Sequence, residues 1–115
     1  MAGKKSTLIL AAVFFLSLLL LSGTVFSLTV DDSIELYERG QREYQRGDYD
    51  EAIEYFDRII NEAPENALTQ VSMYFLGKSY QNLGKTQKAE TTFNRLIDKY
   101  RTGEWVTWAK KELGE

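Results

Sequence analysis

The sequence predicts an all-α chain, in which a hydrophobic N-terminal helix is followed by two helical hairpins and a C-terminal capping helix. Two observations favour this fold class. Residues 8–21 form an apolar run without charge, and the rest of the chain repeats itself with a period of 37 residues. A chain of 115 residues has room for one small domain. We therefore expect a targeting segment over residues 1–30 and one helical domain over residues 31–115.

The N-terminal segment has the pattern of an export signal. Lys4 and Lys5 precede the apolar run, and a stretch rich in small residues follows it. Val25 and Ser27 suit the −3 and −1 positions of a cleavage site after Ser27. Thr24 stands where a bacterial lipoprotein signal needs cysteine, so a lipid anchor of that kind is excluded.

The same segment also fits a membrane anchor. Residues 8–30 would form a helix of about 34 Å, which is long enough to cross a bilayer. The two lysines would stay on the cytoplasmic side. A cleaved leader and an uncleaved anchor both remain open. Each predicts an extracytoplasmic location for residues 31–115, which would be membrane-anchored in one case and periplasmic or secreted in the other.

An internal repeat organises the part of the chain that follows. At a shift of 37 residues, small and aromatic residues coincide in pairs: Gly40 with Gly77, Ala52 with Ala89, and Phe56 with Phe93. A period of this length, with apolar residues at helical spacing inside it, predicts an array of helical hairpins.

The first repeat spans about residues 33–66. Asp32-Ser-Ile-Glu35 resembles a capping box, and it predicts a helix that runs to about Arg46. Gly47 suits the left-handed residue that ends such a helix. Asp48 opens a second helix by the same capping device, and Pro64 closes the repeat because proline cannot continue a helix.

The second repeat spans about residues 67–103. We expect its helices over about 67–83 and 86–100, on either side of Gly84. A last helix over about 104–115 carries Trp105 and Trp108 on one side. We expect this helix to cap the second hairpin with one of the two tryptophans, because two repeats bury little surface by themselves.

These motifs resemble the tetratricopeptide repeat (TPR) family. Gly47-Asp-Tyr-Asp-Glu-Ala52-Ile-Glu-Tyr-Phe56, followed by Pro64, is similar to the second half of such a repeat. Leu76-Gly77-x-x-Tyr80, followed by Gly84, Ala89 and Phe93, is similar to a second copy, and Leu113-Gly114 looks like the opening of a third. The chain departs from the family pattern at Arg39, Glu43 and Arg101. The 37-residue spacing and the Trp105-x-x-Trp-Ala-Lys-Lys-x-Leu ending resemble the repeats of bacterial envelope proteins.

The resemblance assigns packing roles to the repeated positions. Small residues should stand where helices approach closely, and a larger side chain there should cost about 1–3 kcal/mol. The phenylalanines should fill the core, and their truncation to alanine should cost about 3–5 kcal/mol. The packing residues that we expect are Gly40, Ala52, Phe56, Gly77, Tyr80, Ala89 and Phe93.

The resemblance also implies a concave groove, lined by the first helix of each hairpin, for a protein or peptide partner. The groove residues that we expect are Tyr37, Glu38, Gln41, Tyr44, Tyr74, Phe75, Lys78 and Gln81, with Ile34, Gln45, Val71 and Asn82 beside them. Lys78 and Glu38 would fix the orientation of the partner. The alternative interpretation is that Tyr37, Tyr74 and Phe75 pack between helices.

Composition weighs against several other functions. The chain has no histidine and no cysteine, so imidazole catalysis, thiolate chemistry and the usual zinc or haem ligands are absent. We expect no enzyme activity, no metal and no cofactor. Asp48-x-Asp50 begins like a calcium loop, but the required glycine and closing glutamate are missing. Residues 31–115 carry 12 basic and 17 acidic residues, net −5, which disfavours nucleic-acid binding.

Charge is distributed unevenly between the two repeats. Residues 31–66 have 4 basic and 12 acidic residues, net −8, whereas residues 67–115 have 8 and 5, net +3. Such ends could stack head to tail in a homo-oligomer, or they could steer a partner. The sequence thus favours a non-catalytic adaptor or scaffold at the extracytoplasmic face of a membrane. The alternative is a self-assembling structural subunit of a cell-envelope assembly complex.

Overall fold

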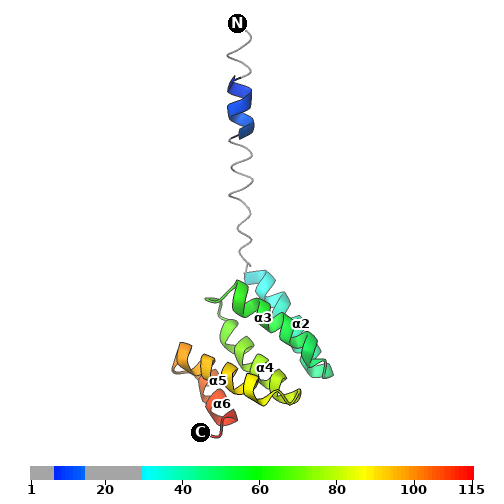
Figure 1. Ribbon diagram of the computed structural model, residues 1–115, viewed down its shortest axis with the longest axis vertical. Coiled ribbons are helices and arrows are strands. Elements are labelled where there is room, and N and C mark those ends of the chain that lie inside the picture. The colour runs from blue at the N-terminus through cyan, green and yellow to red at the C-terminus, as the bar shows by residue number, and fades with distance from the viewer. Residues whose placement is uncertain (1–6, 15–29) are drawn as a thin grey trace.

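A computed structural model of the chain describes residues 7–14 and 30–115, and these residues are helical apart from short connections. Figure 1 shows the successive helices packed side by side. The helices beyond residue 30 are α2 (Val30–Arg46), α3 (Tyr49–Glu62), α4 (Thr69–Asn82), α5 (Thr86–Tyr100) and α6 (Glu104–Glu112). No strand occurs in the described ranges. The predicted all-α class is therefore confirmed for this part of the chain.

The helices form two antiparallel hairpins and one further helix. The first hairpin is α2 with α3, and the second is α4 with α5. Helix α3 also packs on α4, so the hairpins share one continuous core. Helix α6 packs against both α5 and α4. As a result, α2, α4 and α6 are the first helices of three consecutive units.

Both hairpin turns use a glycine in the left-handed region. Gly47 has φ of 84° and Gly84 has φ of 71°. In the first turn, the Gly47 N–H donates to the Tyr44 carbonyl at 3.1 Å and the Asp48 N–H donates to the Glu43 carbonyl at 2.9 Å. This is the Schellman arrangement, which satisfies the last carbonyls of α2. The same pair of bonds ends α4 at Gly84, as the 37-residue register predicts.

The predicted capping boxes are wrong. Helix α2 begins at Val30, so Asp32 lies inside its first turn rather than ahead of it. Asp48 does precede α3, but its side chain makes no capping hydrogen bond. Its backbone carbonyl accepts the Ala52 N–H at 3.0 Å, and its N–H already closes the preceding turn. Both aspartates still place negative charge at a helix N-terminus, where the helix dipole favours it.

The core is built from matching parts of the two hairpins. Phe56 and Phe93 are almost completely buried, together with Ala52 and Ala89. A Cβ atom on Gly40 would lie 2.8 Å from Cε1 of Phe56, so the small residue makes room for an aromatic ring of the neighbouring helix. We expected small residues to let helices approach, and the structure shows that a phenyl ring fills the space at this glycine.

The connection between the hairpins delays the start of α4. The expected start at about residue 67 is two residues too early, because α4 begins at Thr69. The Asn66 side chain accepts the Leu68 N–H at 2.9 Å, which holds the chain in a turn. The Thr69 hydroxyl donates to the Ala63 carbonyl at 2.8 Å and ties the two ends of the connection together.

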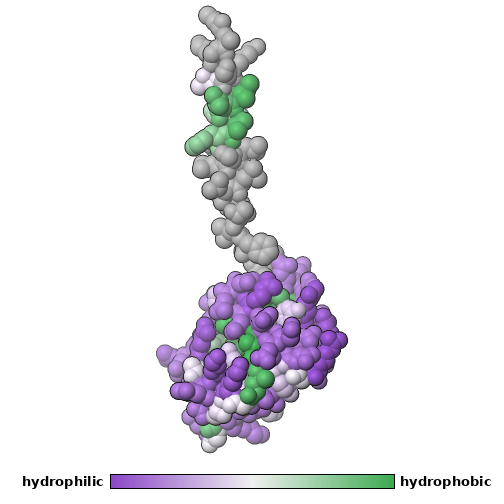
Figure 2. Space-filling model, turned by 45° about the vertical axis from the view of Figure 1, so that its right-hand side comes forward, coloured by the Kyte–Doolittle hydropathy of each residue, from purple (hydrophilic) through white to green (hydrophobic). Residues whose placement is uncertain are grey.

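The N-terminal segment is described only in part. Residues 7–14 are helical, and the side chains of Leu8, Ile9, Leu10 and Val13 are 59–71% exposed. Figure 2 shows this stretch as an apolar surface, in contrast to the mostly hydrophilic surface of the helical domain. Most of the predicted span over residues 8–30 lies outside the described residues. Within residues 7–14 and 30–115, no helix combines the length and the apolar character needed to cross a bilayer.

Candidate partner-binding face

Aromatic rings from α2, α4 and α6 meet on one side of the domain. We call this surface the aromatic face and define it by Tyr37, Tyr44, Tyr74, Phe75 and Trp105. The Tyr44 and Phe75 rings are 5.2 Å apart between centroids, and the Tyr74 and Trp105 rings are 5.5 Å apart. Phe75 also approaches Trp105 at 6.1 Å. The rings therefore join the three helices into one surface.

The aromatic face rests directly on the core. The Phe75 ring stacks on the buried Phe56 at 6.0 Å, and the Tyr37 ring lies 6.2 Å from Phe56. Aromatic pairs at such distances contribute about 0.5–1.5 kcal/mol beyond the burial of their area. The side chains on this face are consequently held in place by the fold before any partner binds.

Amide side chains hold the tyrosine hydroxyls of α2. The Gln41 amide donates to the Tyr37 hydroxyl oxygen at 3.1 Å, and the Asn82 amide donates to the Tyr44 hydroxyl oxygen at 3.4 Å. Burial raises the pKa of Tyr37, and the bond from Gln41 opposes this rise. Because both hydroxyl oxygens accept a bond, each O–H proton remains available to donate to a partner.

A carboxylate of α6 binds two polar groups of α4 beside the aromatic face. Glu112 Oε1 accepts hydrogen bonds from the Tyr74 hydroxyl and from Lys78 Nζ, each at 3.1 Å. Partial burial raises the pKa of Glu112, but the bonds from Lys78 and Tyr74 outweigh it and hold the pKa below its usual range. Desolvation and the bond to Glu112 raise the pKa of Tyr74 to about 12. The carboxylate thus stays charged and the phenol stays neutral near pH 7.

The predicted groove residues do not share one environment. Glu38 is exposed, and Tyr74 is only 8% exposed and lies in the core. The half-buried members are Tyr37, Gln41, Tyr44, Phe75, Lys78 and Gln81. Tyr74 therefore fits the alternative interpretation, in which the ring packs between helices. The rings of Tyr37, Tyr44 and Phe75 are only partly buried. Trp105 and Glu112 were expected as part of a capping helix and not as part of the groove. The spacing of residues within α6 does not reveal that these two side chains contact Tyr74.

Comparison with known proteins decides the family. The sequence matches the tetratricopeptide repeat family over residues 31–102, which is more than half of the chain. The chain belongs to the tetratricopeptide repeat family. Repeats of this family generally mediate protein–protein interaction and are typically non-catalytic. The comparison with curated proteins gives no match.

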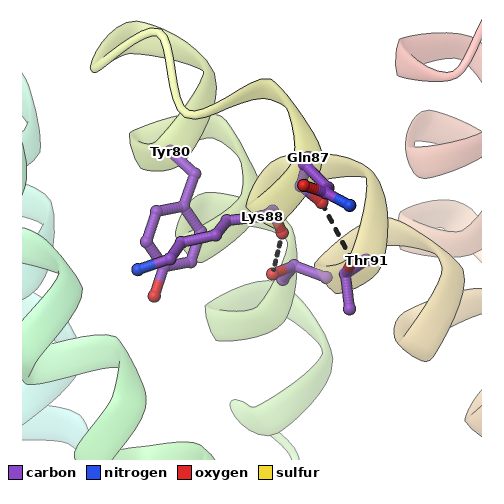
Figure 3. A pocket seen from close by; sticks show the side chains of 5 residues that line it. Tyr80, Gln87, Lys88 and Thr91 are labelled. Atoms are coloured by element: carbon purple, nitrogen blue, oxygen red, sulfur yellow. Dashed lines mark hydrogen bonds between the residues drawn. The ribbon is translucent and has the colours of Figure 1, made fainter.

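Two hollows among the described residues of this tetratricopeptide repeat domain are lined by residues outside the aromatic face. One, of about 400 Å³, is lined by Tyr80, Gln87, Lys88, Thr91 and Thr92. Figure 3 shows the Lys88 side chain lying across the Tyr80 ring, with its nitrogen 5.6 Å from the ring centroid. The Thr91 hydroxyl is turned back to the Gln87 carbonyl at 2.9 Å. A second hollow lies farther along α5 and shares Thr91 with the first. Both are open, and the Thr92 hydroxyl is also turned back to a carbonyl of α5, that of Lys88, at 2.8 Å.

Opposite charges meet between the second helices of the two repeats. Lys85 Nζ of the α5 N-cap lies 3.8 Å from an Asp50 oxygen of α3, and Lys99 Nζ donates to the Pro64 carbonyl at 2.9 Å. Asp57 of α3 is half-buried, and desolvation raises its pKa although Arg95 and Lys88 oppose the shift. Part of the charge difference between the acidic and basic repeats is therefore balanced inside the chain rather than between copies.

The described residues contain no group of three acidic side chains arranged to hold a metal ion. The acids of the repeats lie along helix surfaces, where several pair with arginines of the same helix, such as Glu35 with Arg39 at 2.6 Å and Glu62 with Arg58 at 3.2 Å. Exposed pairs of this kind contribute little to stability. The aromatic face is thus the surface on which the functional interpretation rests.

Proposed function

We propose that this tetratricopeptide repeat protein is a non-catalytic adaptor that binds a segment of another protein on its aromatic face. The observation that carries the proposal is the combination of half-buried rings with anchored polar groups. Tyr44 and Phe75 are open on one side, and the Tyr37 and Tyr44 hydroxyls keep a proton to donate. Tyrosine and tryptophan provide large contact areas with little loss of side-chain freedom, which is typical of binding hot spots.

The energy of binding would come mainly from apolar burial. Removing apolar surface from water contributes about 25 cal/mol for each Å². The amide groups would supply orientation, since Gln41 and Gln81 are half-buried near the rings. Because Lys78 is already bound to Glu112, a partner carboxylate would have to compete with this pair. We therefore propose a partner that contacts the rings and amides rather than the ion pair.

The second part of the proposal is a membrane location. The exposed apolar side chains of Leu8, Ile9 and Val13 lie within the apolar run that follows two lysines, and lipid would cover them. We propose that residues 8–30 anchor the protein or target it for export, with residues 31–115 on the extracytoplasmic side. The 37-residue repeat spacing, which is similar to that of bacterial envelope proteins, supports a role in a cell envelope.

Self-assembly is the second candidate. The net charges of −8 over residues 31–66 and +3 over residues 67–115 favour contact between the unlike ends of two copies. Sedimentation of the full chain in detergent separates this candidate from the first. Association at low salt that fades as salt rises would support a homo-oligomer, and a monomer at every salt concentration would contradict it.

A pair of matched variants tests the binding face. Gln41→Arg places a bulky charge between Tyr37 and Tyr44, and Asn94→Arg places the same charge on the exposed side of α5. Proteins that co-purify with the full chain from its own membranes are quantified for each variant, and melting curves confirm that both fold. We expect Gln41→Arg alone to lose the partner. Equal recovery of the same partner by both variants would contradict the proposed face.

A further inference from the structure

Besides Val30 at the start of α2, two large apolar side chains of the helical domain are exposed, one on α2 and one on α6. Ile34 of α2 is 45% exposed and Trp108 of α6 is 44% exposed. Both occupy the same register position, because they stand 37 residues before and after Val71, which is only 6% exposed. The repeat therefore places an apolar residue at one level of all three helices, and the outer two are uncovered.

Both residues lie on helical stripes that include residues of the aromatic face. Ile34, Tyr37 and Tyr44 follow the spacing of one helical stripe, and Tyr44 contacts Phe75 of α4. Trp105, Trp108 and Glu112 follow a second such stripe, in which Trp105 and Glu112 contact Tyr74. We define an apolar row by Ile34 and Trp108 at its ends, with Phe75 and Trp105, whose rings are 6.1 Å apart, between them.

The two ends of this row differ in charge. Asp31 and Glu38 lie one turn before and after Ile34 in α2, both are exposed, and neither has an ion pair among the described residues. At the other end, Lys111 Nζ lies 5.4 Å from the centroid of the Trp108 ring. Glu104 stands one turn before Trp108, so the α6 end is mixed in charge. At the α2 end, both charged residues that lie one turn from Ile34 are acidic.

We propose that the partner segment is an amphipathic helix that crosses α2, α4 and α6, with Lys or Arg residues at the end lying over Ile34. Packed helices lie about 8–10 Å apart, so a segment that crosses the three helices spans at least about 16–20 Å. At 1.5 Å per residue, this needs a helix of at least about 11–13 residues. Its apolar stripe contacts the row, and its basic end faces Asp31 and Glu38. This inference rests on the proposed function and specifies the partner of the same face.

Designed peptides and charge variants test the inference. The probe is a 14-residue amphipathic peptide with a leucine stripe and two lysines at one end, and its counterpart has glutamates in place of the lysines. Binding to the full chain in detergent is measured by fluorescence anisotropy. We expect wild type to bind the lysine peptide more tightly. In the double variant Asp31→Lys/Glu38→Lys, the glutamate peptide should bind more tightly, and the ratio of the two Kd values should change by about tenfold or more. Trp108→Ala should weaken both peptides.

The matched control changes the net charge equally at another surface. Glu51→Lys with Glu54→Lys alters two exposed acids of α3, outside the aromatic face. It should leave the preference for the lysine peptide in place. The inference is overturned if both double variants change the preference equally, or if wild type binds neither peptide. If both peptides bind equally and Gln41→Arg abolishes that binding, the proposed face stands and only the basic helix is excluded.

Discussion

A Cβ atom on Gly77 would lie 2.5 Å from Cε1 of Phe93 and 2.7 Å from its Cζ. Real side chains do not tolerate such a distance, and the Phe93 ring is buried and cannot swing away. We therefore predict that Gly77→Ala lowers the free energy of unfolding by about 1–3 kcal/mol, although alanine is the better helix former. Urea denaturation measures the loss. The double variant Gly77→Ala/Phe93→Leu should recover part of it, and a Gly77→Ala protein as stable as wild type would contradict this contact.

A substitution at Ser72 should raise the free energy of unfolding, in contrast to Gly77→Ala. The Ser72 hydroxyl is fully buried in α4 and has no hydrogen-bond partner among residues 7–14 and 30–115. Removing an unsatisfied buried hydroxyl relieves its desolvation penalty, so Ser72→Ala should raise the free energy of unfolding by about 1 kcal/mol. Ser79→Ala is the matched control, because the Ser79 hydroxyl donates to the Phe75 carbonyl at 2.7 Å. The prediction fails if the two substitutions shift the denaturation midpoint in the same direction.

The two tryptophans of α6 should differ in their effect on stability. Trp105 is half-buried against Tyr74 and Phe75, so Trp105→Ala should cost about 2–4 kcal/mol. Trp108 is exposed, and Trp108→Ala should cost less than about 1 kcal/mol. Deletion of residues 104–115 should lower the melting temperature further, since it uncovers the second hairpin. Equal melting temperatures for the two alanine variants would show that α6 is not held by Trp105.

Glu112 should make stability depend on pH. Its pKa in the folded protein is below its usual value, so the carboxylate stabilises the fold above the unfolded-state pKa. This contribution is lost as the pH falls through the folded-state pKa. Glu112→Gln should cost about 0.5–1.5 kcal/mol at pH 7, and its difference from wild type should shrink as the pH falls through the folded-state pKa of Glu112. Glu115→Gln serves as the control. A difference that persists unchanged in acid would contradict the assigned bonds to Tyr74 and Lys78.

Much of the fold follows from the repeat itself. The coincidence of Gly47 with Gly84 predicts both turns, and each helix ends there through the same pair of backbone bonds. The pairing of Gly40 with Gly77 and of Phe56 with Phe93 predicts where the hairpins are tight. These positions are predictable because a left-handed backbone and a missing side chain leave few choices of residue.

The candidate site is less predictable, because it depends on contacts between distant residues. Tyr74 occupies an expected groove position, yet α6 covers it through Trp105 and Glu112. The Tyr74–Glu112 bond joins residues 38 positions apart, and no local pattern reveals it. The sequence also does not reveal that Asp48 closes the preceding turn through its backbone N–H and makes no side-chain cap.

Site-specific photo-crosslinking tests the central claim most directly. A photoreactive amino acid is placed in the full chain at Tyr44 on the aromatic face, or at Asn94 on the exposed side of α5, and the protein is illuminated in its own membranes. We predict a discrete crosslinked partner from position 44 that is absent from position 94 and is lost with Gln41→Arg. Crosslinks to the same partner from position 94 alone, or equally from both positions, would contradict binding on the aromatic face.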